Sequence, residues 1–138
     1  MEKMPSKKFA GQYSSLAAIA EFFAQAAQEA GFSSKDTYAV KLAVDEACSN
    51  IIEHSYGGDK QAEICCGYEV LDEGLKITIQ DWGKPFAPEE IPEPNFDVDL
   101  CDLKPRGAGL YFMKKLMDRV EFDFESGDGN LLVMIKRK

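Results

Sequence analysis

The sequence has no run of apolar residues long enough to cross a membrane. Its most apolar stretch, residues 16–30, is interrupted at helical spacing by Glu21, Gln25, Gln28 and Glu29. A membrane span needs about 20 mostly apolar residues in succession, so we expect an amphipathic helix here and no membrane partner. Residues 1–9 contain lysines but no apolar segment directly after them. We therefore expect no secretory leader and a cytoplasmic protein.

An excess of positive charge is also missing. The chain has 16 lysine and arginine residues against 24 aspartate and glutamate residues, which gives a formal net charge of −8. Proteins that bind nucleic acids contact phosphates through a basic surface. The charge therefore argues against direct binding of nucleic acid and leaves protein partners and small ligands open. A bound nucleotide would need Mg²⁺ and local hydrogen-bond donors to offset the repulsion.

The cysteines lack the C-x-x-C spacing of a zinc site. Cys65 and Cys66 are adjacent, so in a strand they would point to opposite faces. We expect all four cysteines, including Cys48 and Cys101, to be free thiols in a reducing cytosol rather than a metal site or disulfides.

The sequence does contain the pattern of one α/β (α+β) domain over residues 1–138. Strand and helix signals alternate in the order β-α-α-β-β-loop-α-β-β. This order predicts a two-layer sandwich in which helices cover one face of a mostly antiparallel mixed sheet. The expected strands are 7–13, 62–71, 75–80, 120–125 and 130–136, and the expected helices are 14–30, from Ser33 or Ser34 to about 55, and 109–117.

The segment between the middle strands and the last helix differs in kind. Five of the six prolines of the chain fall within residues 82–106, with acidic residues between them. A connection of this length inside a compact domain is usually a functional loop or a mobile lid. We therefore expect a lid over about 84–106.

The second expected helix carries Glu46, Asn50 and His54 at i, i+4 and i+8 on one polar stripe. A carboxylate one turn from a carboxamide offers a proton acceptor beside a neutral oxygen ligand for Mg²⁺. Taken alone, the same pattern also describes an ordinary solvated helix face. His54 fits a surface or capping residue better than a phosphoacceptor. The neighbouring apolar arc, expected to face the core, consists of Val40, Val44, Ala47, Cys48, Ile51 and Ile52.

A second motif, Asp81-Trp82-Gly83, directly follows an expected strand. A carboxylate at a strand end can accept a hydrogen bond from an exocyclic amine such as that of adenine. Gly83 lets a ligand approach the backbone closely. A plain Asp-x-Gly turn is the alternative interpretation of this motif alone.

A third motif, Arg106-Gly107-Ala108-Gly109-Leu110, opens the last helix. Glycines at a helix start leave backbone N–H groups free to face phosphate, and Arg106 can add a charge-assisted contact. A flexible helix entry explains the glycines equally well. The three motifs together, on a helix, a strand end and a helix start, are much harder to obtain by accident.

These three motifs resemble those of the GHKL ATPases and kinases. Residues 46–50 (EACSN) are similar to the N box of that superfamily, residues 81–86 (DWGKPF) to its first glycine box, and residues 106–110 (RGAGL) to its second. The length and residues 107–118 (GAGLYFMKKLMD) are most similar to the bacterial anti-sigma-factor serine/threonine kinases. Pro85 departs from the general superfamily, which has a glycine there, and stiffens the entry to the lid.

The resemblance implies a Bergerat fold that binds ATP and Mg²⁺ beneath the lid. Glu46 would be the catalytic general base, Asn50 would ligate Mg²⁺ and Asp81 would recognise adenine. The remaining nucleotide-binding residues would be Gly83, Arg106, Gly107, Ala108, Gly109 and Leu110.

The same resemblance implies a function in a partner-switching module. The protein would be an anti-sigma factor that binds a sigma factor and a protein serine/threonine kinase that phosphorylates a STAS-type anti-anti-sigma protein. A homodimer is a further expectation, because members of the family are commonly dimers. Two alternatives are a non-catalytic module that sequesters a regulator with ATP as a structural ligand, and a detached sensor-kinase ATPase domain. Glu46 counts against the first, because a pure binder would not require that carboxylate.

Overall fold

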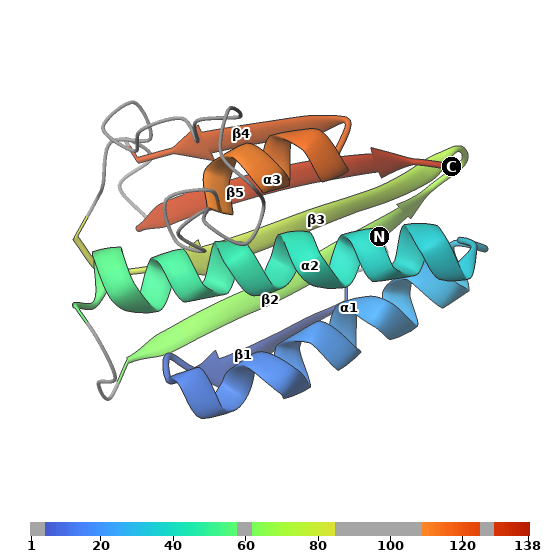
Figure 1. The fold of residues 1–138 in the computed structure, drawn as a ribbon. Coiled ribbons are helices and arrows are strands. Elements are labelled where there is room, and N and C mark those ends of the chain that lie inside the picture. Colours follow the sequence, from blue (N-terminus) through green and yellow to red (C-terminus); the bar gives the residue numbers. More distant parts are fainter. Residues whose placement is uncertain (1–4, 58–61, 85–108, 125–128) are drawn as a thin grey trace, which may run out of the picture.

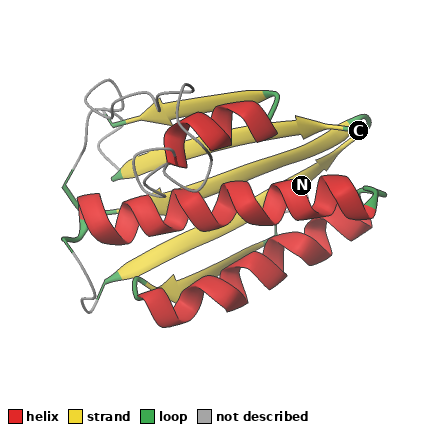
Figure 2. Cartoon of the chain, viewed as in Figure 1, coloured by secondary structure: helices red, strands yellow, loops and turns green. Residues whose placement is uncertain are grey.

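The structure is a computed structural model that describes residues 5–57, 62–84, 109–124 and 129–138, with the backbone alone for 109–112. A sheet forms one layer, and the three helices lie against one of its faces (Figure 1). Figure 2 shows the same two layers coloured by secondary structure. In chain order the elements are β1 (Ser6–Ala10), a 3-10 turn (Tyr13–Ser15), α1 (Leu16–Glu29), α2 (Ser34–Asn50), a π-helical turn (Ile51–Ser55), β2 (Glu63–Leu71), β3 (Gly74–Asp81), α3 (Gly109–Leu116), β4 (Arg119–Asp123) and β5 (Asn130–Arg137).

The sheet has five strands in the order β1-β2-β3-β5-β4. The expected hairpins, β2 with β3 and β4 with β5, are both present. The two-layer fold with helices on one face of a mostly antiparallel sheet is therefore confirmed. All pairings among the described strands are antiparallel, so the parallel pair that a mixed sheet requires does not occur there. The pairing of β3 with β5 sets Asp81 directly opposite Asn130.

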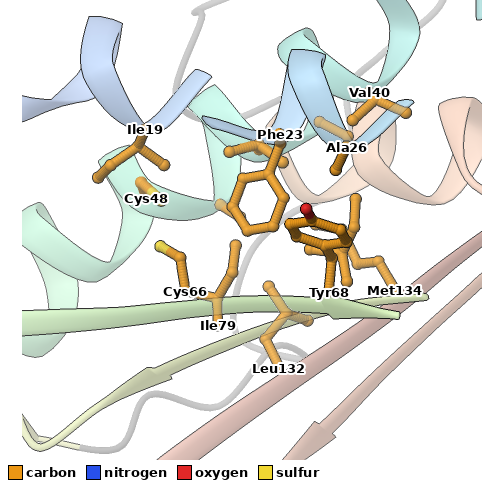
Figure 3. Packing of buried hydrophobic residues seen from close by; sticks show 14 of the residues in the cluster. Ile19, Phe23, Ala26, Val40, Cys48, Cys66, Tyr68, Ile79, Leu132 and Met134 are labelled. Atoms are coloured by element: carbon orange, nitrogen blue, oxygen red, sulfur yellow. The ribbon is translucent and has the colours of Figure 1, made fainter. Parts of the chain in front are cut away.

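The core lies between the sheet and the helices (Figure 3). Alternate residues of a strand point to opposite faces, and on β3 the fully buried residues are Leu75, Ile77 and Ile79. The expected apolar arc of the second helix is buried throughout, which confirms that face. Cys66 lies in this core beside Cys48, whereas Cys65 points to the other face and is half-buried.

The ends of the first two helices follow from local chemistry. Gly31, just after α1, has a φ of 81°, a conformation that glycine adopts without the strain of a side chain. Ser33 caps α2, because its Oγ accepts a hydrogen bond from the Asp36 N–H at 3.1 Å. Ser34 is instead the first residue of the helix. Of the helices that the structure describes, none combines the length and apolar character required to cross a membrane.

Candidate functional site

Asn50, the last residue of α2, points into the fold instead of lying on a solvated stripe. It is 2% exposed, and its Nδ2 has no hydrogen-bond partner among the described residues. Buried polar groups are nearly always hydrogen-bonded, so the Nδ2 donor of Asn50 marks a place for a hydrogen-bond acceptor from a ligand or water. The solvated-face interpretation of this residue is wrong.

The helical hydrogen bonding changes directly after Asn50. Residues Ile51–Ser55 form a π-helical turn, in which hydrogen bonds span one residue more than in an α-helix and which is frequent at functional sites. The His54 side chain is 41% exposed, with Nε2 4.0 Å from Glu53 Oε2. Asn50 is thus buried, whereas His54 is a surface residue, as expected.

Asp81 ends β3 and is 3% exposed. Its Oδ1 accepts hydrogen bonds from the Gly83 N–H at 3.0 Å and from Asn130 Nδ2 at 2.9 Å. Burial raises the pKa of the Asp81 carboxyl above its usual value, and the Asn130 side chain, the Gly83 N–H and the Ser55 side chain oppose the rise. Asp81 is thus a buried carboxylate with a fixed orientation at a strand end.

Packing requires a glycine at position 83, for a reason that the sequence did not reveal. A Cβ atom at this position would lie 2.4 Å from the backbone oxygen of Ser55. The same oxygen accepts a hydrogen bond from the Lys84 N–H at 2.7 Å. Only glycine lets the end of β3 pass this close to the π-helical turn, and the turn is thereby held against Asp81.

Asn50 and Asp81 line one cavity, although they lie on different elements. Its volume is about 10 Å³, which is room for about one water molecule. A nucleotide therefore requires this cavity to widen. The other lining residues are Ala47, Ile51, Met113, Phe122, Phe124, Asn130, Leu131 and Leu132.

The remaining predicted site residues are placed only in part. Glu46 lies one turn before Asn50 on α2 and is half-buried, but does not line this cavity. Gly109 and Leu110 begin α3, as the third motif predicted. Arg106, Gly107, Ala108 and the expected lid from residue 85 onward lie outside the described residues. Their binding roles stay predictions.

The protein groups at this site could hold a divalent cation only together with ligands from a bound substrate. Within the described parts of the chain, no three histidine, cysteine, aspartate or glutamate side chains cluster as a metal site would require. Mg²⁺ is commonly held by one or two protein groups together with substrate phosphates. Asn50, buried at the cavity, is compatible with that mode.

Three cavity residues were missed from the sequence. Asn130 opens β5 and contacts Asp81, and nothing in the local sequence gives the β3–β5 register. Phe122 and Phe124 belong to the β4 region, with ring centroids 5.7 Å apart. Their i, i+2 spacing on an expected strand was the only available signal, because it places both rings on one face.

Comparison with known proteins finds similar sequences. A family model described as "Histidine kinase-like ATPase domain" matches residues 9–136. Serine-protein kinase RsbW of Bacillus licheniformis is 35% identical over 107 residues, which cover 73% of this chain and 66% of that protein. RsbW of Bacillus subtilis (strain 168) is 32% identical with the same coverage. The chain thus spans just under two thirds of the length of these curated relatives.

A solved structure shares the fold at low sequence identity. The crystal structure of the RsbU and RsbW domains of Rv1364c from Mycobacterium tuberculosis superposes with a TM-score of 0.65 at 14% identity. The match covers 96% of this chain and 32% of that chain. Nearly the whole chain therefore corresponds to part of a larger protein of the same fold.

Proposed function

The chain belongs to the family of histidine kinase-like ATPase domains, and from that premise we propose that it is an ATP-dependent protein serine/threonine kinase and anti-sigma factor. In the cytoplasm it would bind a sigma factor and phosphorylate a STAS-type anti-anti-sigma protein, as part of a partner-switching module. Similarity to proteins named serine-protein kinase supports the choice of acceptor. A single domain over 1–138 that forms a homodimer belongs to the same proposal.

The observation that carries the proposal is the meeting of Asn50 and Asp81 in one cavity. A buried carboxylate and a buried amide whose Nδ2 has no partner among the described residues both cost stability, a cost that a bound ligand would offset. The two groups would bind different parts of one ligand. Asp81 would accept a hydrogen bond from the exocyclic amine of adenine, and Asn50 would offer an oxygen to Mg²⁺ at the phosphates. Bound Mg²⁺ would neutralise phosphate charge.

Glu46 is the proposed general base. It lies one helical turn from Asn50, so a substrate hydroxyl at the phosphate end of the nucleotide would be within its reach. Phosphoryl transfer depends mainly on positioning and charge stabilisation, so few side chains suffice. Arg106 and residues 107–110 would supply a cationic group and backbone N–H donors to the phosphates.

Two measurements test the proposal. Mg-ATP should raise the melting temperature, because a ligand that binds the native state stabilises it by about 2.7 kcal/mol at 100 times its Kd. Incubation with labelled Mg-ATP and a STAS-domain protein of the same organism should transfer phosphate to a serine or threonine. If Mg-ATP gives no thermal shift at any concentration, the ATP site itself is wrong.

The variant Glu46→Gln separates binding from chemistry. The amide has nearly the same shape but cannot accept the hydroxyl proton, so transfer should fall by about 10²-fold or more while the thermal shift with Mg-ATP is kept. Glu21→Gln, on the exposed face of α1, is the matched control and should transfer normally. Normal transfer by Glu46→Gln would remove Glu46 from the role of base.

The two alternative functions give different results in the same assay. A non-catalytic sequestering module would show the thermal shift with no transfer to any STAS protein. A detached sensor-kinase domain would yield an acid-labile phosphohistidine, whereas phosphoserine and phosphothreonine survive acid. The half-buried carboxylate of Glu46 beside Asn50 favours the kinase.

A further inference from the structure

We propose that Asn130 is a positioning residue that makes the site selective for adenine, by fixing which oxygen of Asp81 faces the base. The inference rests on the proposed ATP site and adds a residue that none of the three sequence motifs contains. Asn130 lies at the start of β5 and is 5% exposed. It lines the cavity together with Asn50 and Asp81.

The hydrogen bonds at Asp81 assign different roles to its two oxygens. Oδ1 accepts from Asn130 Nδ2 at 2.9 Å and from the Gly83 N–H at 3.0 Å. A carboxylate oxygen has about two lone-pair sites, so Oδ1 is saturated. Oδ2 is therefore the oxygen that can receive the amine of a base.

Asn130 also holds the backbone on which this geometry depends. Its Nδ2 is 3.0 Å from the backbone oxygen of Gly83, to which it donates a second hydrogen bond. One carboxamide thus ties together Asp81, the chain after it and the first residue of β5. Without it, the carboxylate would keep the Gly83 N–H and the neighbouring Ser55 side chain but lose its contact with β5, and its χ2 angle would be less tightly held.

Gly129 explains how the carboxamide reaches this position. It has a φ of 88°, and a Cβ atom there would lie 2.4 Å from the Asp81 backbone oxygen and 2.8 Å from Trp82 Cδ1. Only glycine allows the chain to enter β5 at this distance from Asp81. Asn130 then falls opposite Asp81 in the ladder, where its side chain lies on the same face of the sheet.

The first test compares ATP with purine riboside triphosphate, which lacks the exocyclic amine. Asn130→Ala should lower the affinity for ATP about tenfold or more and leave the affinity for the analogue nearly unchanged, so that discrimination between them falls. Val133→Ala, further along β5, is the control and should keep the wild-type ratio. A merely structural role would weaken both nucleotides equally.

Asn130→Asp is a second variant of nearly the same shape, which guards against a failure of the alanine variant to fold. It would place two carboxyl groups at hydrogen-bonding distance, and both cannot ionise without cost. A protonated Asp at this position would again donate to Asp81. Its affinity for ATP should therefore rise more steeply than that of the wild type as the pH falls from about 8 to about 5.

The sharpest test replaces the hydrogen-bond acceptor that faces the base with a hydrogen-bond donor. In Asp81→Asn, the donors from Gly83 and Asn130 hold the carboxamide oxygen in place of Oδ1 and turn its NH₂ group toward the base. This variant should prefer inosine triphosphate, whose 6-oxo group accepts a hydrogen bond, over ATP. The double variant Asp81→Asn/Asn130→Ala should lose most of that preference.

The outcomes separate the inference from the function on which it rests. An unchanged ATP-to-analogue ratio in Asn130→Ala, or an inosine preference that is equally strong in the double variant, would overturn the role of Asn130 and leave the ATP site intact. A wild-type protein that binds neither ATP nor its analogue would overturn the proposed function as well.

Discussion

At the scale of single residues, the site consists of polar groups whose burial lowers the stability of the fold. Asp81 is 3% exposed and Asn50 is 2% exposed, with Asn50 Nδ2 unpaired among the described residues. Apolar side chains of similar size would make a more stable interior. The positions therefore have a stability cost, which the proposed ligand would offset.

This cost gives Asp81 a defined pH dependence. Because burial raises its pKa in the folded state, the folded chain holds more protons than the unfolded chain between the ordinary and the raised value. Stability falls as the pH rises through that interval, and the full penalty is present above the raised value. Asp81→Asn should therefore be more stable than the wild type at neutral pH, with a difference that shrinks toward about pH 4.

Urea unfolding of the variant and the wild type over a series of pH values measures this difference. Asp72→Asn, in the exposed turn between β2 and β3, is the control and should change stability little at any pH. A wild type that is more stable than Asp81→Asn at neutral pH would show that the hydrogen bonds to the ionised carboxylate outweigh its burial.

At the scale of elements, apolar periodicity and turn residues predicted most of the helices and both hairpins. The end of α1 at Gly31 and the pairing of β2 with β3 follow from local signals, and both are present. The helix expected to continue to residue 55 instead changes to a π-helical turn after Asn50. That change depends on how the chain packs against the end of β3, which no local pattern records.

The sequence predicted the site residues that lie in local motifs, but not the one whose position depends on strand pairing. Asn50 and Asp81 were identified from their own motifs, and the fold brings them to one cavity. Asn130 was missed because its role depends on the pairing of β3 with β5, two strands that are separated in sequence by residues 82–108, α3 and β4. Such long-range register follows from the assembled sheet rather than from neighbouring residues.

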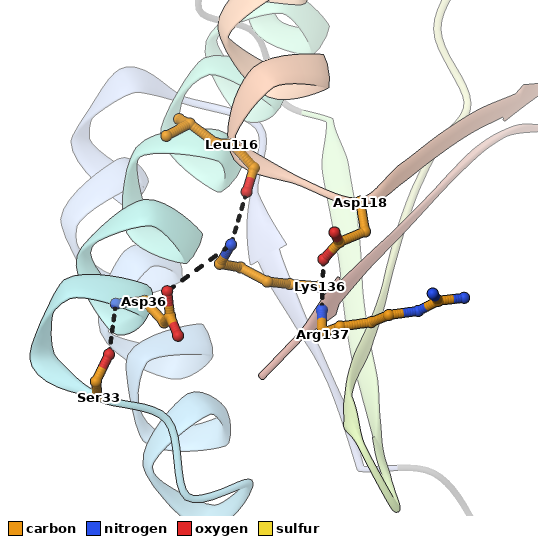
Figure 4. A network of polar contacts seen from close by, with 6 residues as sticks. All are labelled: Ser33, Asp36, Leu116, Asp118, Lys136 and Arg137. Carbon is orange, nitrogen blue, oxygen red and sulfur yellow. Dashed lines mark hydrogen bonds and ion pairs between the residues drawn. The ribbon is translucent and has the colours of Figure 1, made fainter.

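The end of α3 is fastened by a lysine from β5 (Figure 4). Lys136 Nζ donates to the backbone oxygen of Leu116 at 2.9 Å and lies 3.9 Å from Asp36 Oδ1 in the first turn of α2. Nearby, Asp118 Oδ2 accepts from the Arg137 N–H at 2.6 Å. Helix C-termini leave carbonyl groups without partners, so Lys136 satisfies one of them and links α3 to both β5 and α2.

Lys136→Met tests this link while keeping an apolar stem of similar length. Leaving the carbonyl of Leu116 unpaired should lower the free energy of unfolding by about 1–3 kcal/mol and speed amide hydrogen exchange in α3. Lys114→Met, exposed on α3, is the control and should change stability by less than about 0.5 kcal/mol. Unchanged exchange in α3 would show that packing alone holds this helix.

At the scale of the whole molecule, the net charge opposes the proposed ligand. The chain carries a formal charge of −8, and Mg-ATP is also an anion. Charges interact over about 30 Å at 0.01 M salt but only about 8 Å at 0.15 M. At low salt, therefore, the charge of the whole protein repels an approaching nucleotide, whereas at physiological salt only the groups close to the site act on it.

The association rate of Mg-ATP should accordingly rise when the ionic strength increases from about 10 mM to about 150 mM. Stopped-flow measurements with a fluorescent ATP analogue would record the rate. Neutral adenosine is the control, because it has no net charge on which the protein can act and its rate should not depend on salt. Electrostatic steering toward a positive site produces the opposite trend. An ATP rate that falls with salt would therefore mean that a local positive field, such as that of Arg106, dominates over the net negative charge of the protein.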